Sequence, residues 1–355
     1  MISLDDGINL GIGHASRGLI FINFPTIPSE SSTTMRPRAS IPLSRAIQPK
    51  TCQFLPRRYN STAQDVISSF RNNKSNPALR PIQTTDLLSP TQSHLLSLTL
   101  QPYLPFELPK AQKTLPQGHH IVYFPTAAVP ESRLDSDGTE TTYNPGSPFN
   151  RRMWAGGRIE WPESGDLLVG HKTQEQMELD SIEAKQRGGG GELIVMSIRK
   201  TVAQDGNEGV KETRQWVFLK DGDPSAAQAS KKPAIKNTAE TQFQHEVNLT
   251  PAALFRYSAL IFNSHAIHLN KEHCLKEGHP NLVVHGPLTL SLLLEAVRGT
   301  LLGKRWKSVT YRAVGPAYVG ETIRLNVGIE KEGKVEAWAD KGEGTPVMKV
   351  TVELW

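Results

Sequence analysis

The segment GPLTLSLLLEAVRGTLL, residues 286–302, is the strongest helix pattern in the chain and constrains the fold most. Its run of leucines predicts a helix that other elements must bury. Four strand patterns follow it with no further helix pattern: SVTYRAV, TIRLNVGIE, KVEAWAD and PVMKVTVELW. This order predicts an antiparallel sheet wrapped around one helix.

The first half of the chain also has strand patterns. IVYFP (121–125) and four later segments alternate apolar and polar residues as half-buried strands do: GRIEW, LLVGHK, GELIVMSIRKTV and ETRQWVFLK. The glycines at 188–191 precede a strand, so they predict a hairpin turn; a phosphate-binding loop would need a following helix. We therefore expect an α+β fold with one antiparallel sheet in each half.

The composition divides the chain into segments. Residues 65–118 predict one or two helices, and PAALFRYSALIF (251–262) predicts another. Between the halves, GDPSAAQASKKPAIKNTAETQF is small, polar and contains proline, which is typical of a linker. We expect a first domain over 63–221, a linker over 222–245 and a second domain over 246–355.

Residues 1–62 have the composition of a presequence. From position 35 to 64 there are six basic and no acidic residues, with scattered Ser and Thr, as in mitochondrial transit peptides. Residues 1–34 contain three acidic residues and do not share the pattern, so Met35 is a candidate start. A disordered basic tail is the alternative. The pattern predicts a mitochondrial matrix protein.

The overall charge excludes some functions. Of the 40 basic and 35 acidic residues, 7 and 3 lie in the first 60 positions, which leaves 33 against 32 in the remainder. A nearly neutral body predicts no nucleic-acid partner. No apolar run reaches the roughly 18 residues of a membrane span. Two cysteines provide no disulfide framework, which suits a reducing compartment.

Five of the eleven histidines fall between positions 265 and 285. Zinc is one explanation, although no cysteine pair or HExxH pattern accompanies them, and we expect no metal or other cofactor. General acid–base catalysis is the other, because imidazole exchanges protons near neutral pH. In FNSHAIHLN (262–270), His268 is the candidate base, with Asn263 and His265 orienting a water or hydroxyl.

The HGP sequence at 285–287 starts the long helix. Proline suits the first turn of a helix, and a glycine there leaves a bare backbone N–H beside the helix dipole. Gly286 can therefore stabilise an oxyanion, while a tight turn onto the helix is the plain alternative. A base and an oxyanion donor together can enolise a thioester.

These motifs resemble a known family. RYSALIFNSHAIH followed by LVVHGPL resembles the hydratase motif of MaoC-like, R-specific enoyl hydratases and dehydratases, and the 18-residue spacing from His268 to Gly286 is similar. RLDSDG (133–138) and RRMWAGGRIEW (151–161) resemble signatures of the family's first, non-catalytic half. The resemblance covers about residues 85–355 and implies a double hot-dog fold.

The resemblance assigns roles residue by residue. His268 matches the motif's base and Gly286 its oxyanion donor, while Asn263 stands where the broad motif has Asp and is expected only to position other groups. His265 and His285 are expected to bind substrate. Ala266 replaces an Arg of the branch, which favours a monocarboxylic acyl chain.

Arg152 and Arg158 are candidate contacts to substrate, with solvated surface charges as the alternative. The predicted reaction is dehydration of (3R)-hydroxyacyl thioesters to trans-2-enoyl thioesters, on an acyl-carrier protein or CoA, in mitochondrial fatty acid synthesis. A mesaconyl- or itaconyl-CoA hydratase and an inactive scaffold that binds acyl carriers are the alternatives. The oligomeric state is open, with a homodimer as the candidate.

Overall fold

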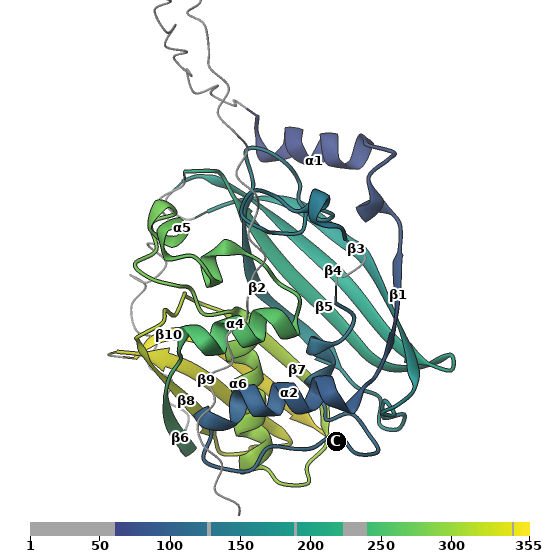
Figure 1. Ribbon diagram of the computed structural model, residues 1–355, viewed down its shortest axis with the longest axis vertical. Helices are drawn as coiled ribbons and strands as arrows, with labels where there is room; N and C mark the ends of the chain where they lie inside the picture. Colours follow the sequence, from purple (N-terminus) through teal and green to yellow (C-terminus); the bar gives the residue numbers. More distant parts are fainter. Residues whose placement is uncertain (1–60, 126–128, 188–189, 223–239, 343) are drawn as a thin grey trace, which may run out of the picture. The chain divides into compact units, whose positions relative to one another are not determined.

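The computed structural model describes residues 61–125, 129–187, 190–222, 240–342 and 344–355. Their ten strands form one antiparallel sheet in the order β1-β3-β4-β5-β2-β7-β10-β9-β8-β6 (Figure 1). The strands are β1 (Ile82–Leu87), β2 (Arg151–Glu160), β3 (Lys172–Gln186), β4 (Glu192–Gln204), β5 (Asn207–Leu219), β6 (Thr241–Asn248), β7 (Trp306–Ala313), β8 (Thr322–Gly328), β9 (Lys334–Lys341) and β10 (Thr345–Leu354).

We expected one sheet in each half, but β2 pairs with β7, from Gly156 opposite Arg312 to Glu160 opposite Ser308. Joining the two edge strands removes two rows of unpaired backbone groups. The halves therefore form a single sheet.

The long apolar helix is present as α6 (Gly286–Thr300). It packs on β6, β8, β9 and β10, as predicted. Leu288, Leu292 and Leu293 are at most 1% exposed, and α6 supplies the centre of the main hydrophobic core. Burying each such leucine is worth about 1.5–3 kcal/mol of folding free energy, so α6 holds the second half together.

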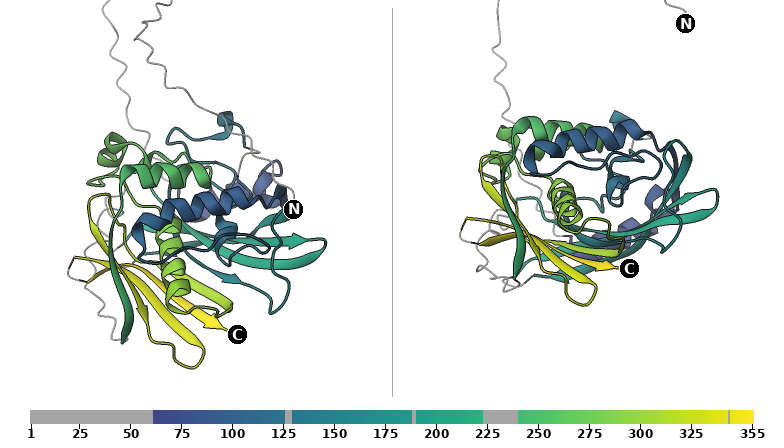
Figure 2. Two further views of the ribbon diagram at one scale, coloured as in Figure 1. Left: turned by 60° about the horizontal axis from the view of Figure 1, so that its bottom comes forward. Right: turned by 90° about the horizontal axis from the view of Figure 1, so that it is seen from below.

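Among the described residues of the first half, no helix comparable to α6 packs across the strands. The short α1 (Ala63–Asn72) packs on β3 and β4, while α2 (Pro90–Leu100) packs against α4 (Pro251–Leu260) of the second half. Figure 2 shows α2 and α4 side by side, with α6 beneath them. Part of the face of β2 and β5 is therefore left open, and it forms one wall of the site described below.

Short helices and 3-10 turns connect these elements. They are η1 (Pro77–Leu79), η2 (Gln101–Tyr103), η3 (His119–Val122), η5 (Glu131–Arg133), η7 (Ala266–His268) and α5 (Lys271–Lys276). The turn η7 lies inside the FNSHAIHLN segment; it follows directly on His265 and ends at His268.

Several boundaries differ from the sequence prediction. IVYFP is not a strand, since its first two residues end η3, and LLVGH precedes β3, which begins at Lys172. The predicted linker ends too late because residues 241–245 already belong to β6. Its residues 223–239, like residues 1–60 of the predicted presequence, lie outside the described residues. β1 and β3 are strands that the prediction missed.

The glycine run connects β3 and β4, which pair antiparallel from Gln174 opposite Ala203 to Gln186 opposite Glu192. Arg187 N–H donates to Gly191 O at 3.0 Å, closing the connection. Gly188 and Gly189 themselves lie outside the described residues. The predicted hairpin is confirmed.

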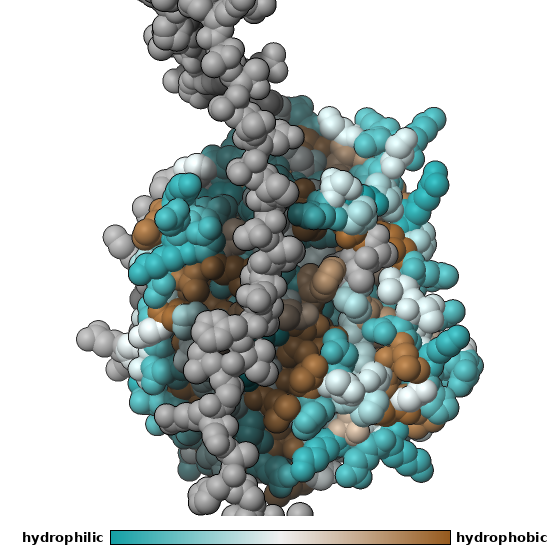
Figure 3. Space-filling view, in the orientation of Figure 1, coloured by the Kyte–Doolittle hydropathy of each residue, from teal (hydrophilic) through white to brown (hydrophobic). Residues whose placement is uncertain are grey.

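The face in Figure 3 mixes polar and apolar side chains, and apolar ones gather over α2 and α4. Leu95 and Leu98 of α2 and Phe255 of α4 are between 41% and 64% exposed. Within the described residues, no helix is long and apolar enough to cross a membrane.

Candidate active site

His268 ends the turn η7 and is 8% exposed. Its Nδ1 lies 2.7 Å from the backbone oxygen of Val283. A carbonyl oxygen only accepts hydrogen bonds, so Nδ1 carries the proton and Nε2 carries the lone pair. Among the described residues Nε2 has no hydrogen-bond partner. His268 lines a large cavity whose walls come from β2, β5, α4, η7 and the start of α6. The ring is therefore fixed in one orientation, and its unprotonated Nε2 is available to a substrate in the cavity.

Burial, together with the nearby His265 and His279, lowers the pKa of His268 to about 3, although the hydrogen bond to Val283 opposes this shift. The neutral imidazole is thus the resting form across the physiological range. A neutral ring is what a base needs before it removes a proton.

His285 stacks on His268, with ring centroids 3.6 Å apart and an interplanar angle of 19°. Its Nε2 is bonded to Ser258 Oγ at 2.8 Å, and its Nδ1 is buried without a hydrogen-bond partner in the described structure. Burial, together with the neighbouring histidines, holds the pKa of His285 well below its usual value. His285 is also the residue that precedes α6, so the stack places the start of that helix beside His268.

Gly286 opens α6 and lines the same cavity as His268. His285 makes no side-chain capping bond to this helix end. The first N–H groups of a helix have no partner within the helix, so they are available to an anion. A Cβ on Gly286 would lie 2.4 Å from Cε3 of Trp154, so the indole excludes any side chain here. The structure thus brings the expected base and oxyanion donor into one cavity.

Asn263 has a local role. Its side-chain Oδ1 accepts a hydrogen bond from the backbone N–H of His265 at 3.0 Å. Its backbone N–H donates to the backbone oxygen of Ser258 at 2.8 Å. The amide oxygen therefore shapes the turn that carries His265. This contact fits the expectation that Asn263 positions other groups.

The His265 ring lies against the first half of the chain. Its Nε2 is 3.3 Å from Oδ2 of Asp137, and its ring meets that of His268 edge to face at 5.6 Å. The RLDSDG segment that carries Asp137 is also bonded to the motif turn, since Ala266 N–H donates to Asp137 O at 2.7 Å. The half that we expected to be non-catalytic therefore contributes a carboxylate to the site.

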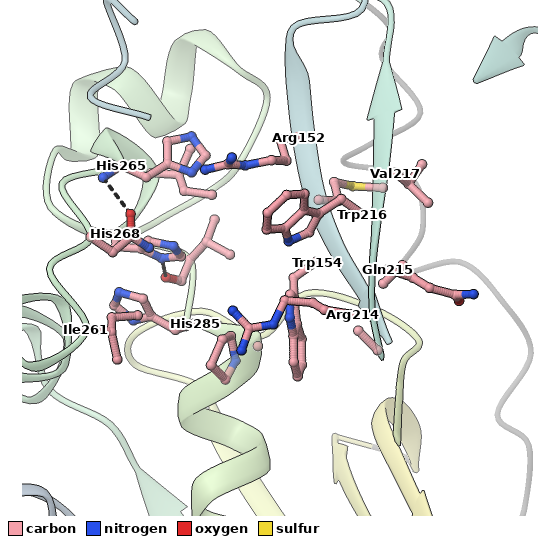
Figure 4. A pocket seen from close by; sticks show the side chains of 18 of the residues that line it. Arg152, Trp154, Arg214, Gln215, Trp216, Val217, Ile261, His265, His268 and His285 are labelled. Carbon is pink, nitrogen blue, oxygen red and sulfur yellow. Dashed lines mark hydrogen bonds between the residues drawn. The ribbon is translucent and has the colours of Figure 1, made fainter. Parts of the chain in front are cut away.

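Strands β2 and β5 form the opposite wall of the cavity. In Figure 4, Arg152, Arg214 and Trp216 point toward the three histidines, whereas Gln215 projects from the other side of its strand. The Trp154 indole lies against Gly286 at the start of α6. Arg214 is neutralised by Glu212, which it contacts with two hydrogen bonds at 2.8 and 3.0 Å.

Arg152 is not neutralised in this way. It donates to the Glu140 backbone oxygen at 3.3 Å and lies 5.0 Å from the centre of the Trp216 ring. No salt bridge to it occurs within the described residues. Burial lowers the pKa of Arg152, while the charges of Glu140 and Asp137 oppose that shift. Its guanidinium is therefore a partly buried donor beside His265 (Figure 4).

Arg158 does not join this wall, contrary to our expectation. A bulge in β2 shifts the register, because Trp154 pairs with Trp216 whereas Gly157, not Gly156, pairs with Arg214. Arg158 is thereby turned to the opposite face, where it bonds Glu160, Thr310 and Glu353 and is 40% exposed. It is a surface charge, which was the alternative.

The other two histidines of the cluster have polar partners of their own. His273 lies 3.4 Å from Glu277 on α5, and His279 Nδ1 lies 3.2 Å from Tyr318 Oη. Within the described residues, no group of three or more His, Cys, Asp or Glu side chains is arranged to hold a metal ion. His265, His268, His279 and His285 line the cavity, and His273 is not among its lining residues.

The sequence analysis missed two residues that position this site. Ser258 of α4 is hydrogen-bonded to the His285 ring. It lies five residues before Asn263, and nothing in the sequence pattern marked it as a site residue. Asp137 lies in RLDSDG, which was noted as a family signature but was given no role. The signature was the only sequence signal for it, because its partner lies 128 residues further along the chain.

The sequence and the fold were compared with known proteins. The family described as hydroxyacyl-thioester dehydratase type 2 matches residues 118–319. Mesaconyl-C(4)-CoA hydratase of Chloroflexus aurantiacus is 30% identical over 278 residues, covering 78% of this chain and 95% of the relative. The mitochondrial hydroxyacyl-thioester dehydratase type 2 of Schizosaccharomyces pombe is 28% identical over 268 residues, covering 68% and 87%.

Solved structures show the same fold. A MaoC-like dehydratase from Phytophthora capsici superposes with a TM-score of 0.57 at 15% identity, covering 81% of this chain and 97% of that one. HtdX from Mycobacterium tuberculosis gives 0.56 at 14%, covering 77% and 99%. Hence the chain has a hot-dog fold and belongs to the hydroxyacyl-thioester dehydratase type 2 family, a group of MaoC-like hydro-lyases.

Proposed function

We propose that this chain catalyses the reversible dehydration of (3R)-hydroxyacyl thioesters to trans-2-enoyl thioesters. The observation that carries the proposal is the fixed His268 ring, whose Nε2 is free in the cavity that also contains the start of α6. His268 Nε2 takes the proton from C2 of the acyl chain. The N–H of Gly286 holds the thioester oxygen as it gains negative charge.

The expected contribution of each group to the reaction rate follows from its chemistry. General base catalysis contributes on the order of 10² to 10⁴ in rate, and one oxyanion donor on the order of 10² to 10³. The acyl group is carried by acyl-carrier protein or CoA. The double hot-dog arrangement supports this reading, because the open face of β2 and β5 leaves room for an acyl chain beside the catalytic turn.

The proposed setting is fatty acid synthesis in the mitochondrial matrix. The basic, acid-free composition of residues 35–64 and the mitochondrial relative from Schizosaccharomyces pombe support it. N-terminal sequencing of protein purified from the organelle tests the setting; residues before Met35 in that protein would contradict a start at Met35. The homodimer stays a prediction, which light scattering of the purified protein tests.

The direct test is His268→Ala, assayed for hydration of crotonyl-CoA with protein that lacks residues 1–60. We expect kcat/KM to fall by at least about 10²-fold because the base is lost. Circular dichroism melting confirms that the variant is folded. A folded variant with wild-type activity would contradict the proposal, as would an inactive wild-type protein, which would favour the scaffold alternative.

A second candidate substrate is a dicarboxylic acyl-CoA, as the name of the Chloroflexus aurantiacus relative suggests. Arg152 favours it, because a partly buried guanidinium with no salt bridge among the described residues can bind a second carboxylate beside the reacting carbons. Although Ala266 removes the guanidinium that the branch has at its position, Arg152 provides one from the other half.

A substrate panel separates the two candidates. Medium-chain (3R)-hydroxyacyl thioesters are compared with mesaconyl- and itaconyl-CoA, in wild type and in Arg152→Gln. If the substrate is dicarboxylic, Arg152→Gln should lower kcat/KM for that substrate about 10-fold more than for crotonyl-CoA, since a charged hydrogen bond is worth about 1.5–3 kcal/mol. Equal loss on all substrates would reject a carboxylate site at Arg152.

A further inference from the structure

The contact between His265 and Asp137 is rigidly built. Asp137 Oδ1 accepts hydrogen bonds from Thr139 N–H at 2.8 Å and Thr139 Oγ1 at 2.6 Å, which leaves Oδ2 for His265 at 3.3 Å. Ser264 Oγ donates to Gly138 O at 2.6 Å and ties the same loop to the catalytic turn. Gly138 has a φ of +80°, and a Cβ there would lie 2.3 Å from Ser264 O, so only glycine permits this approach.

The anchoring of His265 mirrors that of His268. Each histidine has one ring nitrogen fixed by the protein, Nε2 by Asp137 in one case and Nδ1 by Val283 in the other. In each, the remaining nitrogen has no hydrogen-bond partner among the described residues, and both side chains line the cavity. The ring centroids lie 5.6 Å apart, so the two rings are close enough to act on neighbouring groups of one acyl chain.

The two anchors differ in charge. A carbonyl oxygen holds His268, whose pKa lies near 3, so that ring stays neutral. A carboxylate holds His265; burial opposes its ionisation, but the hydrogen bonds from His265 and Thr139 keep the pKa of Asp137 well below its usual value. Asp137 Oδ2, 3.3 Å from Nε2, accepts a hydrogen bond from that nitrogen of His265, and Nδ1 is left without a partner among the described residues. The other groups facing His265 are His268, His279 and the guanidinium of Arg152.

We propose that His265 is a second catalytic residue, whose Nδ1–H protonates the leaving C3 hydroxyl while Asp137 from the first half stabilises its imidazolium. In dehydration, the C2–H bond breaks and its proton moves to His268 Nε2. The C2–H electron pair forms the C2–C3 double bond, the C3–O bond breaks, and the hydroxyl leaves as water with the proton from His265. In hydration, neutral His265 takes a proton from water. The proposal rests on the proposed function and explains how Asn263 can stand at an acidic position of the family motif.

A leaving group that needs no proton tests this role. Chloride leaves from (3R)-3-chlorobutyryl-CoA without an acid, whereas hydroxide leaves (3R)-3-hydroxybutyryl-CoA poorly without one. His265→Gln should lower kcat for dehydration by about 10² to 10⁴, while chloride elimination falls by less than about 10-fold. His268→Gln should lose both reactions, because both need the C2 proton removed.

Asp137→Asn should show the same unequal loss as His265→Gln, and Asp135→Asn in the same loop is the matched control that should retain both reactions. Equal loss of dehydration and chloride elimination in His265→Gln would overturn the proposal and leave His265 a structural residue. Full retention of dehydration would overturn it as well. A wild-type protein that eliminates chloride but dehydrates no hydroxyacyl thioester would instead defeat the proposed function.

Discussion

Gly286 is a residue whose identity is set by a side chain from the other half. The Trp154 indole stacks on Tyr311, with ring centroids 4.6 Å apart, and is therefore held firmly against the start of α6. A methyl group at Gly286 has to displace either the indole or the helix end. Either movement shifts the N–H that is proposed to hold the thioester oxygen.

Gly286→Ala should therefore lower kcat/KM for crotonyl-CoA by at least about 10-fold, since a misplaced oxyanion donor loses much of its stabilisation. Trp154→Leu makes room for the methyl group, so the double variant should be more active than the product of the two single effects predicts. A double-mutant cycle of kcat/KM measures this coupling. Additive effects would show that the clash with Trp154 is not the cause.

Sequence reasoning named most of the residues that the structure brings together at the candidate site, and its errors have physical causes. His268 and Gly286 share one motif, so their spacing was readable. Asp137 was assigned no role because a contact over 128 positions has no local pattern. Arg158 was misplaced because strand alternation assumes an unbroken register, and the bulge in β2 reverses the faces.

Helices and strands were predicted correctly where one face of the element, or the whole element, is buried. The helix α6 and the strands after it have regular apolar spacing, so they were found. The fifteen-residue strand β3 was missed because most of its side chains are polar and at least partly exposed, as in KTQEQMELDSIEAK. Pairing on both sides, with β1 and β4, decides its conformation, and such pairing is not visible in a local pattern.

The turn η7 and the start of α6 each carry a buried histidine, which links their stability to pH. The pKa of His268 falls to about 3 on folding from an ordinary value near 6.5, and that of His285 is also lowered. The unfolded chain therefore binds more protons than the folded one below about pH 6.5. Stability from this source is complete above that pH and is lost as the pH falls toward 3.

The free energy of unfolding should thus decrease between pH 6.5 and 4 by about 1.4 kcal/mol per pH unit because of His268, and His285 should make the decrease steeper. Urea titrations at several pH values measure this slope. His268→Gln should reduce the slope of unfolding free energy against pH by about 1.4 kcal/mol per pH unit, which corresponds to one proton. An unchanged slope in that variant would mean that His268 is not buried in its neutral form.

At the scale of the whole molecule, the halves are joined by more than the chain that connects them. The β2–β7 pairing, the contact between Asp137 and His265, and a hydrogen bond of 2.9 Å from Arg151 to Glu277 O all cross from one half to the other. These contacts do not depend on residues 223–239.

Cutting the chain between residues 222 and 240 should therefore leave a working enzyme. Two co-expressed fragments, 61–222 and 240–355, should copurify and hydrate crotonyl-CoA at a rate within about 10-fold of the intact chain, because the edge strands pair strongly. Affinity purification by a tag on one fragment, followed by the activity assay, measures this. Fragments that separate would show that covalent connection is required.

The contact of the RLDSDG loop with the turn that carries His265 and His268 also affects how activity should be inferred from the sequences of related chains. An annotator who searches only for FNSHxIH and HGP would accept a chain whose loop had lost Asp137 or Gly138, although that chain would lack the counter-charge and the close approach described for this site. Conversely, damage far from the motif can silence such an enzyme. Both segments have to be read together before a gene is counted as active.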